Sequence, residues 1–190
     1  KQKTAYEIGV RLVGSEMCIR DRNWIVVRSK PRSEKIAYAQ LLEKGIEAYL
    51  PLLKERRRWS DRKKWVEFPL FSSYLFANIE VKKSIFVLQT QGVSSLVKFG
   101  EEIAIVQDEV INAIKLAIDG GYKLTPAEYF IAGSEVEVTE GPMSGVKGIV
   151  VQLKGKDRLV IKIDAIQQAL SIDIDTRFIK NINSKSDPIL

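Results

Sequence analysis

The sequence predicts an α+β protein with two domains joined by a linker. In residues 24–118, apolar side chains recur with strand periodicity in some segments and helix periodicity in others. Glycine and proline punctuate residues 119–132, where this periodicity is lost. Residues 133–182 then hold short β-type runs, enough chain for a small β-barrel.

The front domain, residues 23–118, is expected to begin with a strand and a helix. Trp24–Val27 is a continuous apolar run rich in β-branched residues, as in a strand covered on both faces. Pro31 ends this run, Ser33 can cap a helix, and Gly45 can supply its left-handed end. The inward face of the helix is predicted to hold Tyr38, Leu41, Leu42 and Gly45.

The rest of the front domain supplies three more strands and two more helices. The expected elements are a strand at 46–50, a strand at 70–79, a short helix at 84–90, a strand at 96–99, and an amphipathic helix at 110–118 capped by Asp108. The order strand, helix, strand, strand, helix, strand is that of a ferredoxin-like split βαβ domain.

The rear domain, residues 133–182, is expected to hold five short strands. They are placed at 135–139, 148–153, 159–163, 169–174 and 178–182. Residues 183–190 are expected to be a disordered tail. Residues 1–22 show neither a signal peptide's apolar core nor an amphipathic face, and residues 5–22 resemble translated adapter sequence. This extension is interpreted as non-native, the alternative being a native helix packed on the domain.

Composition excludes several classes of function. The 190 residues are 45% hydrophobic and 28% charged, as in an ordinary soluble protein, and no apolar run is long enough for a membrane span. Histidine is absent and Cys18 is the only cysteine, which excludes Cys/His nucleophiles, Ser-His-Asp triads and His/Cys zinc sites. The carboxylates show no paired spacing. We therefore expect a cytoplasmic, monomeric protein that is not an enzyme and needs neither metal nor cofactor.

Positive charge is concentrated in the front half of the chain. The net charge is +6; residues 23–130 carry seventeen Lys/Arg against thirteen Asp/Glu, whereas residues 131–182 carry seven of each. The run KERRRWSDRKKW at 54–65 interleaves basic residues with Trp59 and Trp65. Such a run is typical of a nucleic-acid contact, but equally of a solvated hairpin.

A glycine-rich bend lies between two predicted strands, in VTEGPMSGVKGIVVQL at 138–153. Its glycines lack the GxxxxGK[ST] spacing of a phosphate loop, and a β run follows instead of a helix. We predict that Gly141–Pro142 turns the chain, that Gly145 takes a special backbone angle and that Gly148 permits close packing. The stretch resembles a KOW motif, carried here by Gly141, Pro142, Gly145 and Gly148, which implies an SH3-like barrel.

Four segments of the front domain resemble the N-terminal domain of NusG transcription elongation factors. They are WIVVRSKPR at 24–32, GIEAYLP at 45–51, WVEFPLFSSYLF at 65–76 and QGVSSLVKFG at 91–100. The resemblance covers about 23–182 in the family's order. It implies a front domain that docks on the clamp helices of RNA polymerase and a KOW domain that reaches the ribosome or a termination factor.

The resemblance also implies the site residues. Phe71, Tyr74 and Phe76 correspond to the clamp-facing strand; Tyr74 and Phe76, two residues apart, share one face of a regular strand. Each ring could instead be core. Four basic residues resemble contacts to non-template DNA, although they could serve solubility alone: Lys30, Arg32, Lys82 and Lys83.

The sequence departs from the family in ways that favour a specialised paralogue. Ser72–Ser73 stands where Pro-Gly is common, and Met143 stands where housekeeping members often carry an aromatic residue. We therefore expect an antitermination factor for a restricted set of operons. Two alternatives stay open: a general elongation factor coupled to the ribosome or termination factor, and a ribosomal or RNA-binding KOW protein.

Overall fold

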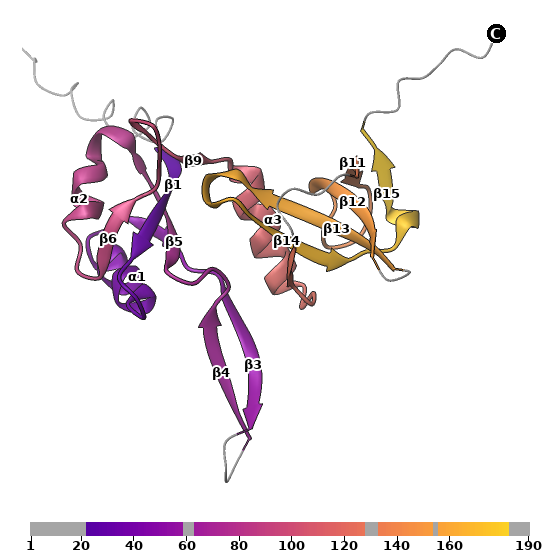
Figure 1. The fold of residues 1–190 in the computed structure, drawn as a ribbon, viewed down its shortest axis with the longest axis horizontal. Coiled ribbons are helices and arrows are strands. Elements are labelled where there is room, and N and C mark those ends of the chain that lie inside the picture. Colours follow the sequence, from indigo (N-terminus) through magenta and orange to yellow (C-terminus); the bar gives the residue numbers. More distant parts are fainter. Residues whose placement is uncertain (1–21, 59–62, 128–132, 154–155, 183–190) are drawn as a thin grey trace, which may run out of the picture.

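The computed structural model describes residues 22–58, 63–127, 133–153 and 156–182 (Figure 1). The predictions for residues 1–21 and for the tail at 183–190 lie outside the described residues. Arg22, assigned above to the extension, is the first residue of strand β1. The chain combines sheets with helices, as the sequence predicts.

The front domain is built on one antiparallel sheet with the strand order β2-β5-β1-β6, and β9 pairs with the other part of β1. Its elements are β1 (Arg22–Ser29), α1 (Glu34–Glu43), β2 (Glu47–Tyr49), β5 (Tyr74–Glu80), η1 (Val81–Lys83), α2 (Ser84–Leu88), β6 (Val93–Leu96), β9 (Ile105–Val106) and α3 (Asp108–Asp119). Two separate hairpins complete it: β3 (Leu52–Arg58) with β4 (Lys63–Pro69), and β7 (Lys98–Phe99) with β8 (Glu102–Ile103).

Both faces of β1 are covered, as its apolar run predicts. Ile25 and Val27 pack into a cluster with Leu41 of α1 and Val87 of α2. Trp24 and Val26 belong instead to a second cluster that contains α3. The sheet thus separates a layer of two helices from a layer that holds α3.

Helix α1 ends as predicted, but it presents a different face to the core. Gly45 adopts φ +72°, its N–H donates to the Leu42 carbonyl, and Ile46 N–H donates to Leu41. This pair of bonds is a Schellman motif. Leu42, however, is exposed, whereas Glu34 and Ala37 join Leu41 in the buried row. The predicted inward face was therefore wrong at Leu42.

The predicted side-chain caps of α1 and α3 are not formed. Ser33 stands at the N-cap of α1, but its hydroxyl makes no cap hydrogen bond and lies 3.4 Å from the Pro31 carbonyl. Gln107 occupies the N-cap of α3, and Asp108, the predicted cap, is the first helical residue. The Asp108 carboxylate in the first turn still has a favourable interaction with the helix dipole.

The rear domain forms a six-stranded sheet of order β10-β14-β13-β12-β11-β15. Its elements are β10 (Thr125–Ala127), β11 (Ser134–Val138), β12 (Lys147–Leu153), β13 (Lys156–Ile163), η2 (Asp164–Ile166), β14 (Gln168–Asp173), η3 (Thr176–Phe178) and β15 (Ile179–Asn181). Five of the strands match the predicted ones. The sixth, β10, lies in the predicted linker.

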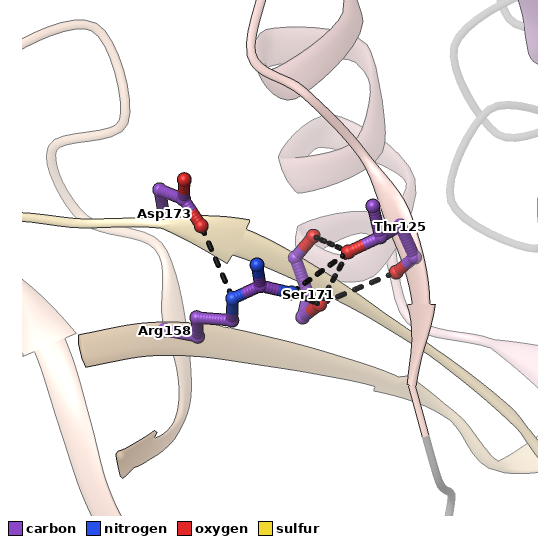
Figure 2. A network of polar contacts seen from close by, with 4 residues as sticks. All are labelled: Thr125, Arg158, Ser171 and Asp173. Carbon is purple, nitrogen blue, oxygen red and sulfur yellow. Dashed lines mark hydrogen bonds and ion pairs between the residues drawn. The ribbon is translucent and has the colours of Figure 1, made fainter. Parts of the chain in front are cut away.

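Strand β10 is tied to the rear sheet by polar side chains (Figure 2). The hydroxyls of Thr125 and Ser171 are 2.8 Å apart, and Arg158 donates from Nη1 to both. Arg158 Nε lies 3.1 Å from Asp173 Oδ1. Pro126 is compatible with this strand because β10 is at the edge of the sheet, where proline's missing N–H is tolerated. The sequence predicts a linker over residues 119–132 and does not indicate this strand within it.

The glycine-rich bend has the conformation that its sequence predicts. Gly141 and Gly145 have φ of +82° and +84°, and Ser144 N–H donates to the Gly141 carbonyl across Pro142. A Cβ at Gly148 would lie 2.7 Å from the Val160 carbonyl oxygen, so only glycine allows β12 to approach β13 this closely. The bend therefore shapes the sheet, and Met143 within it is buried.

Candidate functional site

The three predicted aromatic residues lie close together, but only one reaches the surface. Phe71 and Phe76 meet edge to face with centroids 6.1 Å apart, and they are 2% and 0% exposed. Tyr74 is partly exposed and packs against the same cluster as Phe76, as the period of two predicts. Phe71 precedes the strand, which begins at Tyr74 and not at residue 70.

The turn before β5 is held in a strained conformation by a buried carboxylate. Ser73 adopts φ +67°, which glycine tolerates far better than serine. Its N–H donates to Glu34 Oε1 at 2.8 Å, and its carbonyl accepts from Ser29 N–H. The Ser72–Ser73 departure is therefore accommodated by a hydrogen bond from α1. Sequence reasoning missed Glu34 because its partner lies 39 residues away.

Helix α3 lies over the aromatic face of the front sheet. The Lys115 ammonium sits 5.1 Å from the ring centroid of Trp24 and 5.2 Å from that of Tyr49. Tyr49 in turn stacks on Phe76, with centroids 6.4 Å apart. Burial, reinforced by the nearby Asp119 carboxylate, raises the pKa of Tyr49 well above its usual value. Helix α3 thus covers this face of the sheet.

The opposite side of α3 meets the rear domain (Figure 1). A groove of about 470 Å³ lies between Ala113 and Leu116 of α3 and residues 144–147 of the glycine-rich bend. Buried residues of both domains form one cluster, which runs from Phe76 through Ile114 to Leu159. Helix α3 therefore joins the two domains.

The four predicted nucleic-acid residues do not form one patch. Lys30 and Arg32 follow the last residue of β1, and both are exposed. Lys82 and Lys83 follow Glu80, which pairs with Arg22 at the first residue of β1. An eight-residue strand is about 26 Å long. Each pair therefore lies at its own end of the sheet.

The two pairs also differ in their electrostatic surroundings. Lys83 Nζ lies 2.6 Å from Glu80 Oε1, so its charge is partly neutralised. The turn that holds Lys30 is fixed by a bond from its N–H to the Gly92 carbonyl, and Arg32 has φ +60°. The fixed turn presents both cations to solvent, which favours Lys30 and Arg32 over Lys83 as phosphate contacts.

The described residues of the basic run at 54–65 lie on strands β3 and β4, and residues 59–62, among them Trp59, lie outside the described residues. Trp65 on β4 is 66% exposed. In the part of the chain that the structure describes, no cluster of three or more His, Cys, Asp or Glu residues could bind a metal. Nor does any helix in the described ranges have the length and apolarity of a membrane span.

Comparison with known proteins gives a family match for the front domain. Residues 22–115 match the NusG family model, described as "Transcription termination factor nusG". The chain is similar to Thermotoga maritima NusG, in a structure of its domain interaction, with 16% identity over 86% of this chain and 99% of that one and a TM-score of 0.49. It is also similar to a crystal structure of the MjSpt4:Spt5 complex in conformation A, with 15% identity, 84% and 97% coverage and a TM-score of 0.25.

Proposed function

We propose, from the match of residues 22–115 to the NusG family, that this protein is a non-enzymatic transcription factor that travels with RNA polymerase. It suppresses pausing or termination at a restricted set of operons. It acts in the cytoplasm and as a monomer. The family match carries the proposal. The antiparallel order β2-β5-β1-β6 supports a ferredoxin-like front domain, and the glycine-rich bend supports a KOW barrel behind it.

Phe71, Tyr74 and Phe76 form the proposed contact with the clamp helices of the polymerase. Tyr74 is the member with accessible surface, and a partly exposed phenol suits an interface. Phe71 and Phe76 support it from within the cluster. A helix that contacts all three rings needs α3 and the rear domain to move aside, because both belong to the cluster that buries them.

Binding would act on the polymerase by shifting its conformational equilibrium. A factor that binds the closed clamp more tightly than the open one increases the population of the processive state by its differential affinity. Lys30 and Arg32, with Lys82 and Lys83 at the other end of the sheet, would add attraction to the non-template strand that weakens with salt.

In-vitro transcription on a template with a defined pause, using the cognate polymerase, tests the proposal. The wild-type protein is expected to shorten the pause. Tyr74→Ala should weaken binding to the polymerase by at least about 30-fold, the effect of truncating an aromatic hot spot. Tyr38→Ala is the matched control, since Tyr38 is also partly buried but packs against the other cluster. Equal activity of wild type and Tyr74→Ala would contradict the contact.

A second candidate function is that of a general factor that recruits the termination machinery. The description of the matched family as a termination factor favours it. Met143, where housekeeping relatives often carry an aromatic residue, is 2% exposed and so offers little contact surface here. A pull-down with the full chain decides between the two: strong capture of termination factor, abolished by substitutions in the bend at 141–148, would favour the general factor.

A further inference from the structure

A positively charged groove lies between the β3–β4 hairpin and the first turn of α1. It measures about 740 Å³, and its lining consists of Lys35, Lys54, Lys64, Trp65, Val66 and Glu67. Lys35 comes from α1 and the others from the hairpin. Strand alternation places Lys54, Trp65 and Glu67 on one face of the hairpin, so the groove combines two cations, Lys35 and Lys54, with one carboxylate and one large aromatic ring.

The hairpin that forms this groove has little support from the rest of the molecule. Within the described residues β3 pairs with β4 and with no other strand, and the ribbon projects from the front domain (Figure 1). Leu52 and Leu53 anchor its base by packing against the two clusters. A two-stranded ribbon in water is marginally stable by itself. Its length beyond the anchor thus contributes little to the fold.

Trp65 is exposed in a position where folding gains nothing from it. Its side chain is 66% exposed on β4, next to the exposed Lys64. A tryptophan normally buries most of its surface, and where it stays exposed beside cations it offers a flat ring for stacking. Nucleobases stack on such rings while neighbouring cations contact the phosphates.

Within the described residues, Lys35 and Lys54 share one carboxylate, that of Glu67. Lys54 Nζ lies 3.4 Å and Lys35 Nζ 3.9 Å from the Glu67 carboxylate. All three side chains are substantially exposed, so these ion pairs are weak. Lys35 is the second residue of α1 and follows Arg32 by three residues in the chain.

We propose that this groove binds single-stranded nucleic acid, with the Trp65 ring stacked on a base and with Lys35 and Lys54 on the phosphates. An acidic peptide would satisfy the lysines but would leave the ring unused, and the bases of a duplex are already stacked on each other. This site deepens the attraction to the non-template strand in the proposed function, but it shares no residue with the polymerase contact or with the four basic residues named there.

Fluorescence anisotropy with labelled oligonucleotides of about 12 residues tests the site on the full chain. Oligo-dT, oligo-U and a mixed-sequence duplex are compared. Trp65→Ala should weaken binding of the single strands about 5- to 150-fold, whereas Trp65→Phe, which keeps a ring, should retain most of it. Lys35→Gln and Lys54→Gln should each reduce the slope of log K against log salt by about 0.7.

Glu67→Gln should have the opposite effect, since it releases two lysines and removes the negative charge from the groove. Tighter binding with a steeper salt dependence is expected. Phe99→Ala is the matched control for the ring, because Phe99 is 56% exposed on the other two-stranded hairpin, and Lys180→Gln is the control for charge. Both should bind like the wild type.

Preference for oligo-U would identify RNA as the ligand, and preference for oligo-dT would identify DNA; either supports the proposal. Binding of the duplex as tight as that of the single strands would overturn it. So would a Trp65→Ala protein that binds like Phe99→Ala. Because none of these assays contains polymerase, their result is independent of the transcription experiment.

Discussion

The two faces of the front sheet are buried in different ways. On one face, Ile25 and Leu75 pack against Leu41 and Val87, so residues of the front domain alone complete the cluster. On the other, the cluster that contains Phe76 continues through α3 into the strands of the rear sheet. The first face is an ordinary domain core. The second is a surface shared by two domains.

This difference indicates where the molecule can change shape without unfolding. Helix α3 contacts the front sheet through Lys115, whereas Ala113 and Leu116, on another side of the helix, line the groove toward the rear domain. Residues that pack within one domain must unfold to become exposed, whereas residues between domains need only separation. A partner of the aromatic face therefore competes with α3 and the rear domain.

The largest expected effect is on the free energy of unfolding, when a buried side chain on each face of the sheet is truncated to alanine. Leu41→Ala should lower the free energy of unfolding by about 2–5 kcal/mol, and Ile114→Ala by a similar amount, since both side chains are fully buried. In a chain that ends at residue 127, the cost of Leu41→Ala should persist, but that of Ile114→Ala should shrink because the rear part of its cluster is gone. Denaturant unfolding measures both.

Equal costs of Ile114→Ala in the full and truncated chains would break the comparison. They would mean that α3 and the front sheet complete the aromatic face without the rear domain. The same truncation should also expose Tyr74 further, which acrylamide quenching or chemical modification of tyrosine can detect.

A smaller effect is expected where α1 holds the turn next to the aromatic face. Glu34→Ala removes the acceptor of the Ser73 N–H and should lower stability by about 1–3 kcal/mol. Glu34→Gln keeps an amide oxygen as acceptor and should lose less. Thermal unfolding followed by circular dichroism measures the difference between the two variants.

Ser73→Gly is the companion test, because Ser73 adopts a left-handed conformation. Glycine should relieve about 1 kcal/mol of backbone strain, partly offset by a more flexible unfolded chain. The gain should be larger in the Glu34→Ala background, where the bond that holds the turn is absent. A Ser73→Gly protein less stable than the wild type would show that the serine side chain itself is required.

Local features of the fold were predictable from the sequence because they depend on neighbouring residues. Gly45 ends α1 with a positive φ, and the glycines of the bend at 141–148 turn the chain and allow close packing. Tyr74 and Phe76 share a face because strand side chains alternate. Backbone conformation and side-chain period follow from a few adjacent residues, so no tertiary information was needed.

Features that depend on distant partners were missed or misplaced. Leu42 is predicted to face the core, but it is exposed. The buried row of α1 instead contains Glu34, whose carboxylate accepts a hydrogen bond from the Ser73 N–H. The strand at Thr125–Ala127 was read as linker because its partner β14 lies more than 40 residues further on. The site residues were named from local motifs, whereas their covering by α3 and their distribution over two ends of β1 are tertiary properties.

The smallest effect on stability at neutral pH is expected for Tyr49, which lies on the face of the sheet that α3 covers. Burial, with Asp119 nearby, raises the pKa of this phenol above its ordinary value of about 10. Since the folded pKa is the higher one, the contribution of Tyr49 is fully present below pH ~10 and is lost as pH rises above it. Wild type should therefore lose stability faster than Tyr49→Phe in alkaline solution, while the two behave alike at neutral pH. Absorbance at 295 nm should show an ionisation above the ordinary pKa of tyrosine that is missing in Tyr49→Phe, and it should move to lower pH once the rear domain is removed if the rear domain holds α3 in place. A phenol that titrates normally in the full chain would mean that α3 does not cover this face in solution.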